Sequence, residues 1–292
     1  MSAHRRAERR LAWWLCAPAV SAMLAVTAFP ILYAFWLSLF RYDLRFPAER
    51  RFVGLGNYAS ILGSEIWWQA LGNTLIITVG SVAVELVLGF ALALVMHRAT
   101  FGRRTVRAAI LVPYALVTVV AALAWRFAFD PSTGFINALL GLGRVWLTER
   151  GPAFLVIIFA EIWKTTPFMA LLLLAGLTLV PQDLLHAARM DGASASQRFL
   201  RITLPLMKPA VMVALLFRTL DAFRVFDTVF VLTRGALDTE TVSIVGYNAL
   251  ITRLNLGLGS AVSVLIFLCV LAIAVAYIKG FGALLTGQDE RR

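Results

Sequence analysis

The sequence predicts an all-α protein that crosses a membrane with six helices. Three observations support this prediction. Hydrophobic residues make up 60% of the 292 residues, charged residues make up only 15%, and the mean hydropathy is +0.82. Soluble domains average about half apolar and about a quarter charged residues. Long apolar windows recur along the chain, and short basic segments separate several of them.

Each apolar window reaches the ~20 residues that an α-helix needs to cross the hydrocarbon core. The predicted spans cover residues 11–40, 71–96, 108–129, 153–177, 210–233 and 256–278. The first window resembles a secretory signal, but it is too long and has no A-x-A-like cleavage site, so we expect an uncleaved span. No internal repeat or soluble domain boundary is visible, and residues 1–292 are expected to form one membrane domain.

The distribution of lysine and arginine predicts the orientation. The segments on one side of the membrane, residues 1–10, 97–107, 181–209 and 279–292, hold 15 lysine and arginine residues. The segments on the other side, residues 41–70, 130–152 and 234–257, hold eight. Because basic loops stay inside the cell, both termini are expected in the cytoplasm, on a multi-pass protein of the cytoplasmic membrane. The net charge of +11 then reflects topology and contacts with anionic lipid, and no nucleic-acid partner is expected.

Several chemistries are excluded by missing motifs. The only lysine followed by threonine, Lys164, comes after Trp163 rather than glycine, so the chain has no phosphate-binding loop of the Walker A type. The three histidines, His4, His97 and His186, show no metal-ligand spacing. We therefore expect neither catalysis, nor a metal, nor a cofactor bound by this chain.

A polar insert at residues 181–209 separates the fourth and fifth spans. Pro181 suits a first helical turn, and Gly192 can adopt the left-handed conformation that ends a helix, so a helix of about two to three turns is predicted between them. Pro205 and Pro209 favour a break before the fifth span. This helix could enter a groove on another protein, or it could rest as an amphipathic helix on lipid headgroups.

The residues of this insert carry a specific resemblance. His186-Ala187-Ala188, then Gly192, then Ile202-Thr203-Leu204-Pro205 reproduce the spacing of the EAA loop, E-A-A-x3-G-x9-I-x-L-P. That loop is typical of the membrane permeases of binding-protein-dependent ABC importers. Most of the chain resembles the carbohydrate branch of that family, on the side of the maltose and glycerol-phosphate permeases, and above all the permeases of actinobacterial trehalose importers.

The resemblance implies an ABC importer type I permease that carries a sugar, such as the disaccharide trehalose, by alternating access. It implies a second homologous permease, two ATPase subunits that hold ATP and magnesium, and an extracytoplasmic sugar-binding protein, a lipoprotein, as partners. It also implies a coupling helix at about 182–192 that sits in a cleft of the ATPase. The residues assigned to coupling are His186, Ala187, Ala188, Asp191, Gly192, Leu204 and Pro205.

One position departs from the family pattern. The leading Glu of the EAA loop is His186 in this chain. A salt bridge from that Glu is therefore not implied, whereas the helix, the glycine turn and the proline exit are retained.

The predicted fifth span carries four charges of alternating sign at intervals of three residues. They are Arg218, Asp221, Arg224 and Asp227, and neighbouring pairs can meet on adjacent helical turns. Charges near the bilayer centre are costly against lipid, so we expect them to face protein or a watery cavity. Two interpretations stay open. The charges form either a self-neutralising surface packed against a partner subunit or a polar wall of the translocation path that hydrogen-bonds sugar hydroxyls.

Other candidates for the substrate path lie outside the fifth span. Glu161 and Lys164, three residues apart in the fourth span, are predicted to pair with each other. Tyr247 and Asn248 precede the sixth span and are candidate contacts for substrate or binding protein. We expect substrate capture itself to occur on another protein, because the external loops are too short to form a binding module.

A hypothesis from another functional class is a stand-alone, ion-coupled secondary transporter. Ionisable groups inside a membrane often serve as proton or ion sites. Glu85, Asp221 and Asp227 would be the protonation sites in that case. Dependence of uptake on an ATPase partner, rather than on an ion gradient, would distinguish the two hypotheses.

Overall fold

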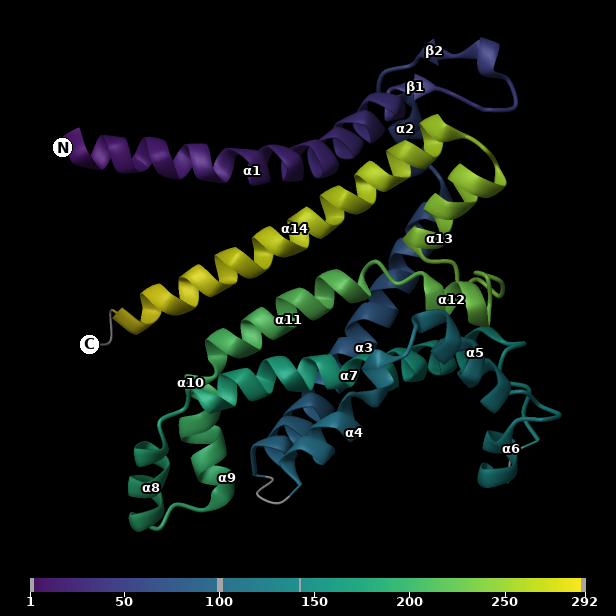
Figure 1. The fold of residues 1–292 in the computed structure, drawn as a ribbon. Coiled ribbons are helices and arrows are strands. Elements are labelled where there is room, and N and C mark those ends of the chain that lie inside the picture. The colour runs from purple at the N-terminus through teal and green to yellow at the C-terminus, as the bar shows by residue number, and fades with distance from the viewer. Residues whose placement is uncertain (1–2, 99–101, 142, 290–292) are drawn as a thin grey trace. The chain divides into compact units, whose positions relative to one another are not determined.

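The computed structural model describes residues 3–98, 102–141 and 143–289 and confirms the predicted all-α class (Figure 1). Within these residues, four helices are long and apolar enough to cross a membrane. They are α1 (Ala3–Ser38), α3 (Glu65–Arg98), α7 (Arg150–Thr178) and α14 (Leu256–Asp289). These helices coincide with the first, second, fourth and sixth predicted windows.

The third and fifth predicted windows coincide with bent helix pairs rather than straight helices. In the third, α4 (Arg103–Ala115) meets α5 (Thr118–Ala128) at 86°, because Leu116 and Val117 between them are extended. Just before the fifth, where Pro205 and Pro209 predicted a break, Ala195–Leu206 meets Lys208–Leu232 at 69°. A further interruption follows within that second segment, since four residues separate the end of α11 at Ala222 from the start of α12 (Asp227–Leu232).

The chain forms two compact units, and the first contains residues up to Ser64 together with Gly246–Leu265. It includes a short antiparallel pair of strands that the sequence did not predict, β1 (Phe40–Arg41) and β2 (Arg51–Phe52). The turn between them contains η1 (Pro47–Glu49), and α2 (Gly56–Leu62) follows β2. Hydrogen bonds from Arg45 lower the pKa of Asp43 in this turn to about 2.

Asn57 of α2 secures the exit from α1 in the same unit. Its side-chain nitrogen donates to the carbonyl oxygens of Ser38 at 2.7 Å and Phe40 at 2.9 Å. These carbonyls lie where α1 ends and would otherwise lack intrahelical partners. The hydrogen bonds therefore fix the turn from helix to strand.

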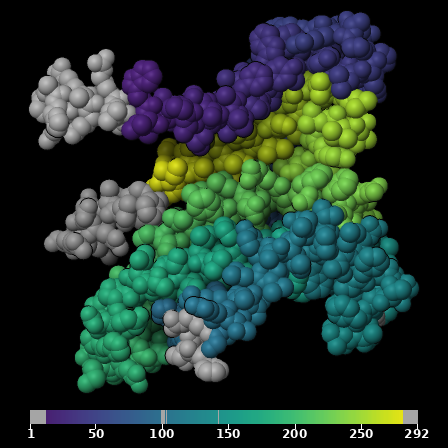
Figure 2. Space-filling view, viewed as in Figure 1, coloured from purple at the N-terminus to yellow at the C-terminus, as the bar shows by residue number. Residues whose placement is uncertain are grey.

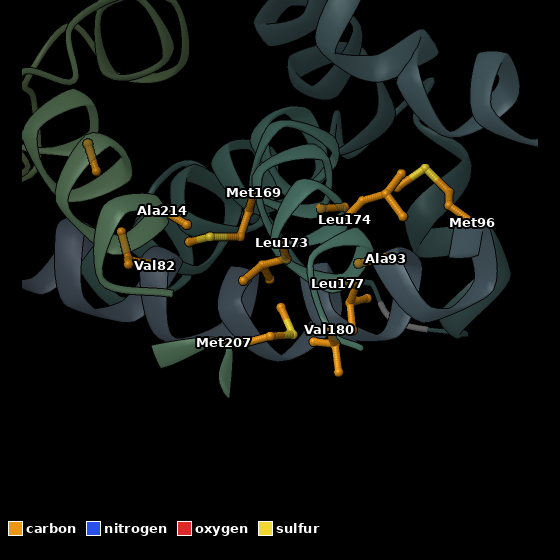
Figure 3. Close-up of a cluster of buried hydrophobic side chains, with 12 residues drawn as sticks. Val82, Ala93, Met96, Met169, Leu173, Leu174, Leu177, Val180, Met207 and Ala214 are labelled. Carbon is orange, nitrogen blue, oxygen red and sulfur yellow. The ribbon is translucent and has the colours of Figure 1, made fainter. Parts of the chain in front are cut away.

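The second unit, Glu65–Val245 with the residues from Ile266, holds the main helical packing. Here α3 lies along α7, and α4 and α11 pack beside them (Figure 1). Methionine, leucine and alanine side chains from these helices fill the core, with Met169, Leu173 and Leu177 of α7 among them (Figure 3). The helices α8 (Gln182–Met190) and α9 (Ala195–Arg198) form a projecting lobe of this unit, at the lower left of Figure 2.

A glycine permits the close approach of α7 and α11 (Lys208–Ala222). A Cβ added at Gly176 would lie 2.5 Å from the Cβ of Ala210 and 3.3 Å from Cε of Met207. We expect Gly176→Ala to lower the free energy of unfolding by about 1–3 kcal/mol, because the two backbones must separate. The measurement is thermal unfolding of the purified protein in detergent.

Gly72 of α3 provides the matched control for this substitution. Nothing lies within 4 Å of a Cβ added there, so Gly72→Ala should be neutral or stabilising by up to about 1 kcal/mol. Equal unfolding temperatures for the two variants would contradict the close contact of α7 with α11.

Candidate functional site

Arg218 of α11 is the centre of a charged cluster inside the second unit. Its side chain is fully buried, as is that of Glu85 on α3. Its Nε donates to Glu85 Oε2 at 2.5 Å and its Nη2 donates to Glu85 Oε1 at 3.0 Å, which makes a bidentate pair. Nη2 also lies 3.3 Å from Oε2 of Glu161 on α7. One guanidinium thus joins three membrane-spanning segments.

Hydroxyl groups complete the hydrogen bonding of the two buried carboxylates. Thr165 donates to Glu85 Oε1 at 2.9 Å, and Thr228 of α12 donates to Glu161 Oε1 at 2.5 Å. Buried charges are costly unless they are paired and their remaining hydrogen-bonding positions are filled. The cluster meets both conditions, and it connects α12 to the three longer helices.

A polar cavity of about 450 Å3 lies next to this cluster. Residues of α4, α5, α7, α11, α12 and the segment between α11 and α12 line it, namely Tyr114, Thr118, Glu161, Lys164, Thr165, Asp221, Arg224, Val225, Phe226, Asp227 and Thr228. Carboxylates, cations and hydroxyls together give it both hydrogen-bond donors and acceptors. Such a lining suits a neutral molecule rich in hydroxyl groups.

An aromatic pair forms part of the cavity region. Tyr114 stacks on Phe168 with ring centroids 5.3 Å apart. The Lys164 ammonium lies 5.6 Å from the Tyr114 centroid and donates to the carbonyl oxygen of Leu116 at 3.1 Å. The predicted pairing of Lys164 with Glu161 is therefore wrong, because Glu161 turns toward Arg218 and Thr228 instead.

Of the contacts predicted between neighbouring charges in this series of four, only the first, between Arg218 and Asp221, is present. Nη1 of Arg218 donates to Asp221 at 2.8 Å, while the Asp221 side chain remains 63% exposed. Beyond Asp221 the prediction is wrong, because α11 ends at Ala222 and the helical periodicity is lost. Among the residues described, no ion pair joins Arg224 to Asp221 or to Asp227, and both Arg224 and Asp227 line the cavity instead.

Two predicted path residues belong to the first unit. Tyr247 ends α13 (Val242–Tyr247), and Asn248 begins the π-helical turn η3 (Asn248–Thr252). Both are half-buried, and Thr252 donates to the side-chain oxygen of Asn248 at 3.3 Å. A contact of these residues with substrate stays a prediction.

The second candidate region is the EAA-type loop. Gly192 ends α8 with φ +78°, and its amide donates to Arg189 while the amide of Ala193 donates to Ala188. This pair of bonds is a Schellman motif, as expected for a glycine after a helix. Ser194 and Gln197 then form a capping box that begins α9. The predicted helix and its end at Gly192 are present, and a second short helix, α9, follows them.

The remaining coupling candidates lie on or after this helix pair. His186, Ala187 and Asp191 are exposed, and Ala188 is half-buried. Leu204 and Pro205 are half-buried in α10 (Leu204–Leu206), which follows the π-helical turn η2 (Phe199–Thr203). Backbone hydrogen bonds thus link successive helical turns from α9 through η2 and α10 into α11, the helix that holds Arg218.

A comparison with known protein families covers both candidate regions. The family model described as the binding-protein-dependent transport system inner membrane component matches residues 85–281, which include the charged cluster and the EAA-type loop. The chain is 56% identical over 285 residues to a trehalose transport system permease protein of Mycobacterium tuberculosis, covering 98% of this chain and 93% of that protein. It is 41% identical to a trehalose/maltose transport system permease protein of Thermococcus litoralis, covering 93% and 94%.

A solved structure shares the fold. A chain of a bacterial ABC transporter involved in the import of the acidic polysaccharide alginate superposes with a TM-score of 0.80, covering 94% of this chain and 97% of that chain. The sequences are 22% identical, so this likeness concerns the arrangement of helices. The overall arrangement of helices is therefore one that a solved transporter structure also has.

Proposed function

Because this chain belongs to the family of binding-protein-dependent transport system inner membrane components, we propose that it is the permease subunit of an ABC importer for a sugar, specifically a disaccharide such as trehalose. The observation that carries the sugar assignment is the 56% identity, across 98% of the chain, to a trehalose transport permease. The cavity supports it chemically, since carboxylates, cations and hydroxyls there can bind sugar hydroxyls and Tyr114 offers an aromatic face.

The proposed mechanism is alternating access driven by partner subunits. An extracytoplasmic binding protein delivers the sugar, a second homologous permease completes the path, and two ATPase subunits bind ATP and magnesium. Closure of the ATPases moves α8, and the hydrogen-bonded turns of α9, α10 and α11, which bend by 69° after Leu206, carry that movement to the cavity. This assignment requires α8 and both termini to lie in the cytoplasm, as the distribution of basic residues predicts.

The alternative of an ion-coupled transporter gains no support from the family. Of its suggested protonation sites, Glu85 is engaged in a bidentate pair with Arg218, whereas Asp221 and Asp227 line the cavity. Uptake by the complete complex should therefore require ATP and continue after ion gradients are collapsed with ionophores. Uptake that follows the ion gradient and ignores ATP would reject the proposal.

Asp227 tests the role of the cavity. We expect Asp227→Asn, which keeps the shape and removes the charge, to lower the maximal rate of trehalose uptake by about tenfold, because a hydrogen bond to a charged group contributes about 1.5–3 kcal/mol. The measurement is uptake of radiolabelled trehalose by vesicles containing the complete transporter.

Asp238 provides the isosteric control. It is exposed, does not line the cavity and has a φ of 55°, which asparagine tolerates well. Asp238→Asn should leave uptake unchanged. Equal effects of the two substitutions, or none for Asp227→Asn, would remove the cavity from the sugar path.

A further inference from the structure

A second cavity, of about 370 Å3, lies behind the helices of the EAA-type loop. The ends of α3 and α7 form one side, and α8, α9 and η2 form the other. Five basic or imidazole side chains line it, and none of the described residues in its lining is a carboxylate. They are His97 and Arg98 of α3, His186 and Arg189 of α8, and Arg198 of α9.

The three arginines carry charge that the described part of the chain does not neutralise. No ion pair joins Arg98, Arg189 or Arg198 to a carboxylate among the described residues. Arg198 donates to the carbonyl oxygen of Ala193, a neutral partner. Like charges gathered at one cavity repel each other, so an anion placed among them is stabilised.

The helix dipole explains the position of individual basic residues, but it does not explain why several of them line the same cavity. His97 and Arg98 occupy the last turn of α3, and Arg189 occupies the last turn of α8, where cations interact favourably with the helix dipole. That effect acts within the last turn of each helix separately. It does not require three helices to place basic side chains around one cavity.

The rest of the lining indicates which anion fits. Gln182 and the buried Thr203 add polar groups that can donate hydrogen bonds. Arginine forks match the oxygen atoms of phosphate groups particularly well. The apolar wall, which includes Leu177 and Phe199, could accommodate the carbon chain attached to a phosphate.

We propose that this cavity binds a phosphate group, carried either by the headgroup of an acidic phospholipid or by a soluble phosphate compound. Since α3 supplies two of the basic side chains and α8 and α9 supply three, a bound phosphate bridges the lobe to the membrane-spanning helices. Its occupancy therefore stabilises one position of α8 relative to α3. The site is separate from the sugar path and does not depend on which sugar is carried.

The test measures binding to the complete transporter, purified with its partner subunits. In one arm, native mass spectrometry counts phosphatidylglycerol retained from nanodiscs of phosphatidylglycerol and phosphatidylcholine. In the other, equilibrium dialysis measures radiolabelled inorganic phosphate in detergent without lipid. We expect the double variant Arg98→Gln, Arg198→Gln to weaken binding at least about tenfold in the arm that reports the natural source.

Arg201→Gln is the matched control, because Arg201 is an exposed arginine of η2 that does not line the cavity. Binding that is lost in the double variant and kept in Arg201→Gln supports the site, and the responding arm identifies lipid or soluble phosphate as its source. Equal binding by all three proteins, or equal loss in both variants, overturns the proposal. If the double variant fails to assemble, the exposed Arg189→Gln replaces it with the same expectation.

Discussion

Replacing Arg218 by methionine is expected to destabilise the protein by about 3–5 kcal/mol, the usual cost of removing one partner from a buried ion pair. Methionine fills much of the same space but leaves Glu85 and Glu161 without the guanidinium with which both form ion pairs. Two unpaired carboxylates then remain inside a membrane-spanning bundle, where each is costly. Thermal unfolding of the purified protein in detergent should show a midpoint lowered by roughly 10 °C.

Arg224→Met serves as the control for the loss of one arginine. Arg224 lies two residues after the end of α11, but it is exposed and has no ion pair among the described residues. We therefore expect its unfolding midpoint to stay within about 2 °C of the unaltered protein. Equal midpoints for the two variants would mean that the buried cluster does not stabilise the fold.

A rescue variant separates charge from packing. In Arg218→Met combined with Glu85→Gln and Glu161→Gln, no charge of the central cluster remains, and the amides can still accept hydrogen bonds from Thr165 and Thr228. Replacing a buried ionic group by neutral side chains of similar size is often neutral for stability. We therefore expect most of the lost stability to return, and failure to recover would assign the effect of Arg218→Met to packing.

The sequence predicted the fold class and the loop well because their signals are local. A window of about 20 apolar residues identifies a span without knowledge of its neighbours. In the same way, Pro181 and Gly192 define a helix by backbone preferences that act within a few residues. The Schellman motif forms at Gly192, the residue that predicted the end of the helix, whereas the capping box of Ser194 and Gln197 was not predicted.

The charged cluster could not be predicted in this way, because its partners are far apart in the sequence. Arg218 and Glu85 are separated by 133 residues, and Arg218 and Glu161 by 57. Spacing within a helix favoured Glu161 with Lys164 and Arg224 with its neighbours, whereas helix packing and the end of α11 at Ala222 decided otherwise. The sequence analysis identified Glu85 only as a possible protonation site inside a span, and not as the partner of Arg218.

Replacing Gly192 by proline is expected to abolish ATP-driven uptake while the protein still inserts into the membrane. Gly192 ends α8 with φ +78°, whereas proline fixes φ near −65° and removes the amide that donates to Arg189. The direction of α8 relative to α9 is then lost. A partner can shift the permease between states only through contacts that differ between those states, and a displaced α8 cannot make them. The measurement is ATP-dependent trehalose uptake by vesicles, and membrane insertion is checked separately.

Gly141→Pro is the control with the same local strain. Gly141 ends α6 (Phe135–Leu140) with φ +63°, its amide donates to Asn137, and nothing lies within 4 Å of an added Cβ at either glycine. Each substitution therefore places proline at a helix end where φ is positive and removes one amide donor, at α8 in one variant and at α6 in the other. Uptake should survive Gly141→Pro, because α6 belongs to a loop predicted to lie outside the cell. Normal uptake by Gly192→Pro, or equal loss in both variants, would show that α8 does not transmit the movement of the ATPase.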